Sequence, residues 1–173
     1  MFINLNQNKN LKLFKIISSV ASENGQTVYA VGGYVRDLLM GRATPTDIDF
    51  VTEQSGIALA KSIAEQVAPE QKVSVFKTYG TAMFRYEDLE LEFVGARKES
   101  YSEDSRNPAV EQGSLEDDQK RRDFTINAMA ISLNQENFGE LIDPFNGRQD
   151  LADKILRTPL EPRQTYSAAP AKG

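Results

Sequence analysis

The hydrophobic positions along the chain predict alternating helices and strands. In some segments apolar residues recur every three or four positions, which favours helices, and elsewhere they gather with β-branched residues in short runs, which favours strands. The predicted helices cover residues 9–24, 34–40, 57–67 and 148–154. The predicted strands cover residues 27–31, 48–52, 72–76, 81–86, 89–95, 128–133 and 140–142, and those at 81–86 and 89–95 form a hairpin.

Two stretches depart from this pattern. Residues 97–113 are polar and without periodicity, which predicts a functional or mobile loop rather than an ordinary connection. Ser114 comes next and precedes acidic residues, which predicts a charged helix with a serine cap. The tail 161–173 is rich in proline and alanine, so we expect a domain over residues 1–160 followed by a loose end.

Composition places the chain among globular proteins of one domain. It has 173 residues, 40% of them hydrophobic and 26% charged. We expect a cytoplasmic protein with no membrane partner, because no apolar run approaches ~18 residues and no secretory pattern opens the chain. The absence of cysteine predicts no disulfide partner. The net charge of −5 argues against a large nucleic-acid surface, although several basic residues gather between positions 97 and 122.

A glycine pair separates the strand at 27–31 from the helix at 34–40. Gly32 and Gly33 allow backbone N–H groups to approach a phosphate closely, and the start of the helix adds a partial positive charge. Arg36, one turn into the helix, can reach the same anion with its guanidinium. The alternative is a plain tight turn in which Arg36 and Asp37 form a surface pair.

Carboxylates are the candidate catalytic groups, because the chain has no histidine to act as a base or a zinc ligand. Asp47 and Asp49 are two positions apart on a predicted strand, so both face one side and can attract Mg²⁺. The alternative is a solvated strand edge, but the nearby glycine turn favours a metal site. Either Glu90 or Glu92 can supply a further acid for a two-metal site, and periodicity does not choose between them.

A third polar group lies ahead of the strand at 128–133. Its two guanidiniums, carboxylate, hydroxyl and amide can bind triphosphate and ribose together, although an ordinary charged surface is the alternative. These groups belong to Arg121, Arg122, Asp123, Thr125 and Asn127. The later segment 143–147, Asp-Pro-Phe-Asn-Gly, predicts a turn with a structural role.

Taken in order, these motifs resemble a known family. They read Gly-Gly-x-Val-Arg-Asp, Asp-x-Asp, Arg-Arg-Asp-Phe-Thr-x-Asn-Ala and Asp-Pro-Phe-Asn-Gly-x-x-Asp-Leu. The chain is similar to the catalytic head of class II CCA-adding tRNA nucleotidyltransferases and of the related bacterial poly(A) polymerases. The resemblance covers residues 28–158. It implies an α+β, polymerase β-like head in which helices flank a small mixed sheet.

The resemblance also implies roles for single residues. The reaction would add nucleotides from CTP or ATP to the 3′ end of tRNA, with two Mg²⁺ ions as cofactors. The implied metal ligands are Asp47 and Asp49, and Glu92 completes the acidic cluster, since the family spacing to a following arginine favours it over Glu90. The implied nucleotide contacts are Gly32, Gly33, Arg36, Arg122, Asp123 and Asn127.

The chain departs from the family after Ser167. There the family continues into a helical neck that selects the base and a body that grips tRNA, so we expect an isolated head that is weak or inactive alone. Residues 98–108 resemble the flexible loop needed for the final adenosine, which speaks against addition of cytidines only. The remaining alternatives are a poly(A) polymerase head, a compact nucleotidyltransferase acting on another substrate, and a nucleotide-binding module without catalysis.

Overall fold

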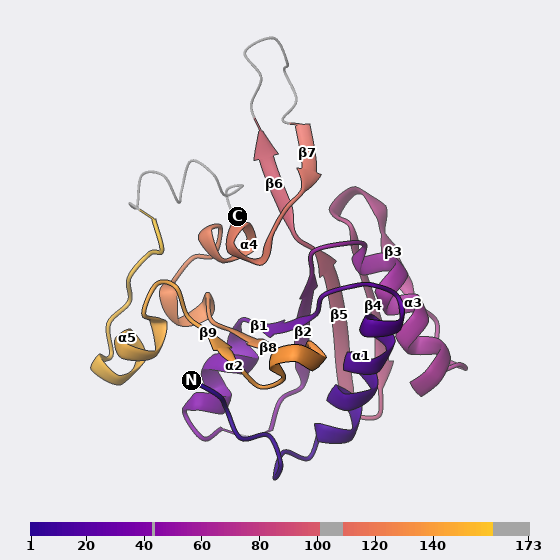
Figure 1. Cartoon of the computed structure of the whole chain (residues 1–173), viewed down its shortest axis with the longest axis horizontal. Coiled ribbons are helices and arrows are strands. Elements are labelled where there is room, and N and C mark those ends of the chain that lie inside the picture. The colour runs from indigo at the N-terminus through magenta and orange to yellow at the C-terminus, as the bar shows by residue number, and fades with distance from the viewer. Residues whose placement is uncertain (43, 101–108, 161–173) are drawn as a thin grey trace.

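A computed structural model of the chain describes residues 1–42, 44–100 and 109–160 (Figure 1). One mixed sheet has the strand order β3-β4-β5-β2-β1-β8-β9. Of its neighbouring pairs, β2 and β5 run parallel and the others run antiparallel. The strands of this sheet are β1 Tyr29–Val31, β2 Asp47–Thr52, β3 Ser74–Phe76, β4 Thr81–Tyr86, β5 Leu89–Gly95, β8 Ala130–Ser132 and β9 Leu141–Ile142.

Helices lie on both sides of the sheet (Figure 1). The α-helices are α1 Leu11–Glu23, α2 Gly33–Leu39, α3 Gly56–Val67, α4 Leu115–Lys120 and α5 Gly147–Asp153. Short 3₁₀ turns are η1 Lys77–Tyr79, η2 Thr125–Asn127 and η3 Gln135–Asn137. The predicted α+β architecture, a mixed sheet flanked by helices, is confirmed. None of the helices in the described ranges is long and apolar enough to cross a membrane.

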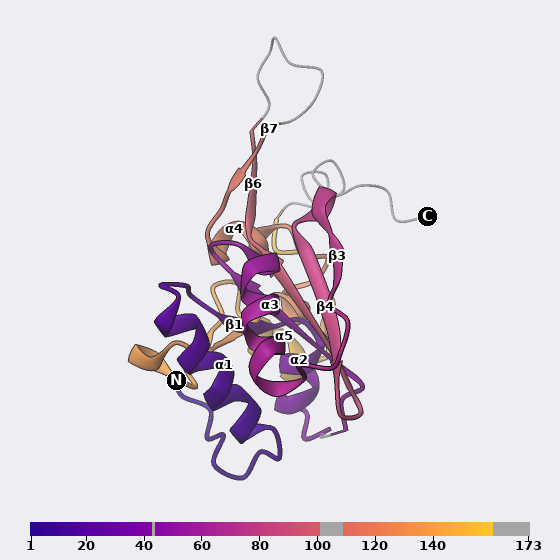
Figure 2. The same ribbon diagram turned by 90° about the vertical axis from the view of Figure 1, so that its right-hand side faces the viewer.

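One face of the sheet forms the main core with α1 and α3, which lie next to each other in Figure 2. Alternation along β2 and β5 sends Ile48, Phe50, Leu91 and Phe93 to this face, where each is at most 1% exposed. The rings of Phe50 and Phe93 stack with centroids 4.8 Å apart. These contacts fix the register of the two strands that carry the candidate acids on their other face.

The opposite face is partly covered by α4. Leu115 of α4 belongs to a smaller buried cluster with Val31, Val51 and Ala130 of the sheet. Ser114 caps α4 as predicted: its hydroxyl accepts from the backbone N–H of Asp117, while the Asp117 carboxylate accepts from the N–H of Ser114. This cap fixes the residue at which α4 begins. The basic motif at 121–127 follows directly after α4.

The prediction of an irregular stretch over 97–113 was wrong for its two ends. Arg97–Ser100 forms β6 and Ala109–Gln112 forms β7, which pair as an antiparallel ribbon apart from the main sheet. β6 reads Arg-Lys-Glu-Ser and β7 reads Ala-Val-Glu-Gln, so neither shows the alternation that marks a strand with one buried face. Residues 101–108, and with them most of the expected flexible loop, lie outside the described residues, as does the tail 161–173.

Candidate active site

Four acidic side chains share the open face of the sheet where β2 runs beside β5. The parallel register places Asp47 opposite Glu90 and Asp49 opposite Glu92. Side chains of directly paired residues point to the same face, so the two aspartates and two glutamates lie together. The structure thus brings together all three acids expected from the sequence, and adds Glu90 beside Asp47.

Burial and mutual repulsion raise the pKa values of two of these acids. The pKa of Asp49 is raised by burial, against the lowering effect of the Arg122 guanidinium, and Asp47 raises it further. The pKa of Glu92 is raised by burial and then by the charge of Asp49. Raised pKa values of this kind mean that burial and the neighbouring acids disfavour the charged forms more than Arg122 favours them.

The four acids do not form a preformed metal-binding site. Within the described ranges, no group of three or more His, Cys, Asp or Glu side chains is arranged to hold a metal ion. Asp47 is exposed, and its Oδ1 accepts a hydrogen bond from the Thr46 hydroxyl at 3.2 Å. Carboxylate oxygens are nevertheless the ligands that Mg²⁺ prefers, and the negative charge gathered on this face fits a cation.

The glycine pair lies between the acids and two arginines. Gly32 has a positive φ of 73°, and a methyl group added there would lie 3.3 Å from Nη1 of Arg122 and 3.9 Å from Oδ2 of Asp49. One added at Gly33 would lie 3.1 Å from Nη2 of Arg36. Position 32 therefore favours glycine because of its positive φ, whereas at Gly33 an added methyl group would press only on the flexible end of the Arg36 side chain.

Each arginine is held by its own carboxylate. The Asp118 carboxylate accepts from Nε and from Nη2 of Arg122, each at 3.1 Å, across one turn of α4 and the residues that follow. Arg36 donates from Nε to Asp37 at 3.1 Å. Sequence reasoning missed Asp118, although its i,i+4 spacing from Arg122 is the usual signal of such a pair.

Asn127 links the basic motif to the glycine turn. Its Oδ1 accepts from Nη1 of Arg36 at 2.7 Å, and its Nδ2 donates to Oδ1 of Asp123 at 3.1 Å. Two residues expected to meet the nucleotide thus also orient the Arg36 guanidinium. Arg36 and Asn127 are 91 positions apart in the sequence, and they meet because η2 packs against α2.

The segment 143–147 forms the turn expected of it and leads into α5. Asp143 accepts from the backbone N–H groups of Gly147 and Arg148 at the start of α5. Buried Asp150, on the same helix, accepts from the Thr125 hydroxyl at 2.6 Å. These contacts fix η2, the turn that ends with Asn127.

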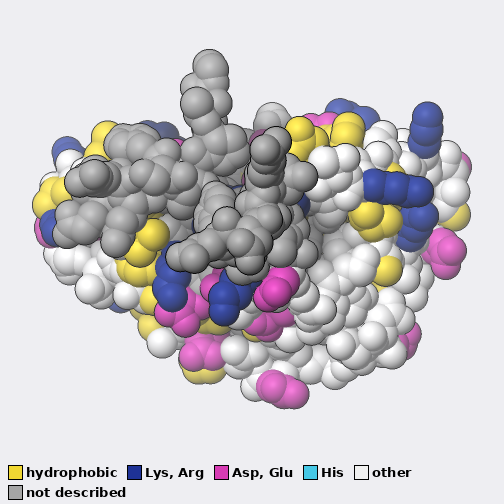
Figure 3. All heavy atoms as spheres, turned by 90° about the horizontal axis from the view of Figure 1, so that it is seen from above, with side chains coloured by type: hydrophobic (Ala, Val, Ile, Leu, Met, Phe, Trp, Pro, Cys, Tyr) yellow, Lys and Arg dark blue, Asp and Glu magenta, His cyan; other side chains and the backbone are white. Residues whose placement is uncertain are grey.

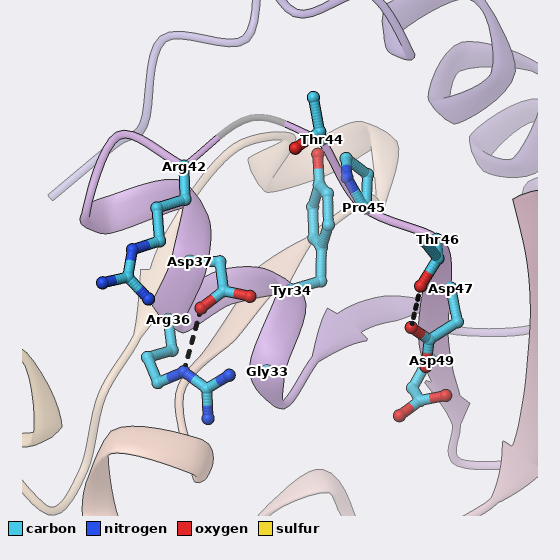
Figure 4. Close-up of a pocket in the computed structure, with 10 residues that line it drawn as sticks. All are labelled: Gly33, Tyr34, Arg36, Asp37, Arg42, Thr44, Pro45, Thr46, Asp47 and Asp49. Atoms are coloured by element: carbon cyan, nitrogen blue, oxygen red, sulfur yellow. Dashed lines mark hydrogen bonds and ion pairs between the residues drawn. The ribbon is translucent and has the colours of Figure 1, made fainter.

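A cavity of about 370 Å³ opens beside these groups. Figure 4 shows Asp47 and Asp49 on one wall and Arg36, Asp37 and Arg42 on the other, with Gly33 between them. Negative and positive groups therefore face one space, which is the arrangement required by a cation bound to an anionic phosphate chain.

Residues 28–157 match the family model described as the poly A polymerase head domain. The chain belongs to this family. Its head domain is 49% identical over 129 residues to an A-adding tRNA nucleotidyltransferase of Aquifex aeolicus, an alignment covering 75% of this chain and 15% of the relative. It is 37% identical over 151 residues to the A-adding tRNA nucleotidyltransferase of Halalkalibacterium halodurans, covering 87% of this chain and 35% of the relative.

The fold of the head domain matches a solved structure as well. A crystal structure of a tRNA nucleotidyltransferase complexed with a primer tRNA and an incoming ATP analog superposes with a TM-score of 0.72 and 44% identity. The match covers 83% of this chain and 39% of the other. The chain spans little more than a third of these longer proteins at most. The predicted nucleotidyltransferase head is confirmed, and the relatives are enzymes of that type.

Proposed function

We propose that this head domain transfers nucleotides from ATP or CTP to the 3′ end of tRNA. The observation that carries the proposal is the pairing of Asp49 with Glu92 beside Asp47, on a face that also presents Arg36 and Arg122. The similarity to A-adding enzymes supports ATP as a substrate and favours tRNA over a poly(A) tail as the acceptor.

Asp47 and Asp49 would hold Mg²⁺, with Glu92 completing the acidic face. The bound ions would activate the attacking 3′ hydroxyl and neutralise charge on the triphosphate. Arg36, oriented by Asn127, and Arg122, held by Asp118, would bind phosphate oxygens and balance the charge that develops during transfer. Gly32 and Gly33 let the phosphates approach the backbone without a side chain in the way.

Calorimetry with ATP and CTP tests the nucleotide site. The 173-residue chain is expected to bind both weakly in Mg²⁺ and more weakly in EDTA, and Asp47→Ala and Asp49→Ala should remove the metal dependence. Asp88→Ala is the matched control, because Asp88 is an exposed acid in the β4–β5 turn. Affinity that is the same in all four proteins, with or without metal, would support a binding module without catalysis.

Extension of tRNA is the second test. Because the chain corresponds to a minor part of its longer relatives, we propose that segments outside the head select the base and make most of the contacts with tRNA. The head alone should therefore extend a tRNA lacking its terminal adenosine poorly. Rapid and faithful extension by this chain would place base selection within the head itself.

A further inference from the structure

The open face of the sheet becomes exposed toward its β3 edge. Four directly paired residues form a row across this face, one from each of β2, β5, β4 and β3: Val51, Val94, Thr81 and Phe76. Val51 is fully buried in the cluster that contains Leu115 of α4, Thr81 is only 8% exposed, and Phe76 at the edge is 46% exposed. The face that carries the acids thus ends, at β3, in a large exposed aromatic ring.

A second aromatic ring and several cations lie at this edge. Tyr79 in η1 is 64% exposed, and the guanidinium carbon of Arg97 lies 6.0 Å from its ring centre. Arg97 also donates to the carbonyl of Thr78 at 3.3 Å, and Lys77, which follows Phe76 in the sequence, is exposed. Figure 3 shows Lys and Arg side chains next to hydrophobic ones on the α3 and β3 side of the molecule.

The edge is close to the acids along the same face. Ser74 pairs with Met83, and Met83 pairs with Glu92, so Phe76 lies two strands and two residues away from Glu92. With strands about 4.8 Å apart and a rise of about 3.3 Å per residue, this separation is roughly 12 Å. A strand of a few nucleotides would span it.

We propose that Phe76, Lys77, Tyr79 and Arg97 form a surface that binds single-stranded RNA. The bases would stack on the two rings, while the cations contact the phosphates. A surface with exposed aromatic rings is suited to unpaired bases, which can stack on the rings, whereas a duplex hides the faces of its bases. The proposal rests on the proposed function, because the RNA would be the acceptor strand whose 3′ end reaches the acids.

Fluorescence anisotropy with a labelled single-stranded RNA of about 12 nucleotides tests this surface. The measurement is made at low salt in EDTA and without nucleotide. Tyr79→Ala and Phe76→Ala should each weaken binding about 5- to 100-fold. Phe2→Ala is the matched control, because Phe2 is also 64% exposed but lies near the other end of the molecule, and it should bind as the wild type does. Lys77→Gln should reduce the slope of log K against log salt by about 0.7.

Three outcomes would overturn the proposal: unchanged binding by both aromatic variants, equal affinity of the wild type for an RNA duplex, or no RNA binding at all. Loss of a dimer in Phe76→Ala, seen by sedimentation while RNA binding stays unchanged, would assign the surface to a second copy of the chain.

Circular dichroism checks that the variants fold. Calorimetry with Mg-ATP separates the two hypotheses, since Tyr79→Ala should retain the nucleotide affinity of the wild type even where RNA binding is lost.

Discussion

Replacing Asp150 by alanine should destabilise the domain through one buried hydrogen bond. Asp150 is 5% exposed and accepts from the Thr125 hydroxyl, which is itself 1% exposed. A buried hydroxyl left without its partner costs about 1–3 kcal/mol. The ion pair of Asp150 with Arg157 at 3.4 Å adds little, because the Arg157 side chain is 62% exposed. We therefore expect a loss of about 2 kcal/mol, or a Tm lower by about 4–8 °C.

The same substitution should weaken nucleotide binding from a distance. Thr125 begins the η2 turn that ends with Asn127, and Asn127 orients Arg36. Loosening this turn should lower ATP affinity, measured by calorimetry in Mg²⁺, at temperatures where the variant remains folded. Asp153→Ala is the control on the same helix, since Asp153 is exposed and its carboxylate accepts a hydrogen bond from Gln149, which is not part of the turn.

Urea unfolding of a double-mutant cycle checks the assignment. Thr125→Val and Asp150→Ala should each destabilise the domain, and the double variant should cost less than their sum because both remove the same contact. Fully additive losses, or an Asp150→Ala variant as stable as Asp153→Ala, would refute the idea that this hydrogen bond holds the turn.

Two further substitutions test the acids and the helix cap. Because burial and Asp49 raise the pKa of Glu92, the wild type loses stability as pH rises from the ordinary carboxyl pKa through the raised one. In EDTA, the stability of Glu92→Gln should thus match that of the wild type near pH 4 and exceed it at neutral pH, measured by thermal melts; a constant difference across this range would contradict it. Ser114→Ala should cost about 1 kcal/mol by removing the α4 cap, whereas Ser114→Asp should retain most of the stability in urea unfolding.

Local pattern was sufficient to predict most elements of the fold. The β4–β5 hairpin has the predicted bounds, because alternating residues meet a polar Glu87-Asp88 turn, where Glu87 takes a positive φ of 53°. The ends of β1 and β3 are shorter than predicted, since their first residues have suitable side chains but lack a paired neighbour. Strand pairing is a tertiary property, so sequence pattern overestimates it at the edges.

The site was predictable where one segment supplied the pattern, and not where two segments meet. Asp47 and Asp49 follow from the two-residue period of a strand. Periodicity left Glu90 and Glu92 equivalent, and only the parallel register places Glu92 beside Asp49. The contact of Arg36 with Asn127 joins elements that no local rule connects. The same holds for Asp150, whose partner Thr125 is 25 residues away.

The core face of the sheet determines how the acids meet on the open face. β2 and β5 each alternate apolar and acidic residues, so a slip of one residue between them would turn one set of acids into the core and is strongly disfavoured. The stacked rings of Phe50 and Phe93, which pair directly across the two strands, fix this register from the side opposite the acids. The spacing of Asp49 and Glu92 is therefore a consequence of aromatic packing rather than of any attraction between the acids, which repel each other. Stability of the core and assembly of the acidic face are thus two results of one strand pairing.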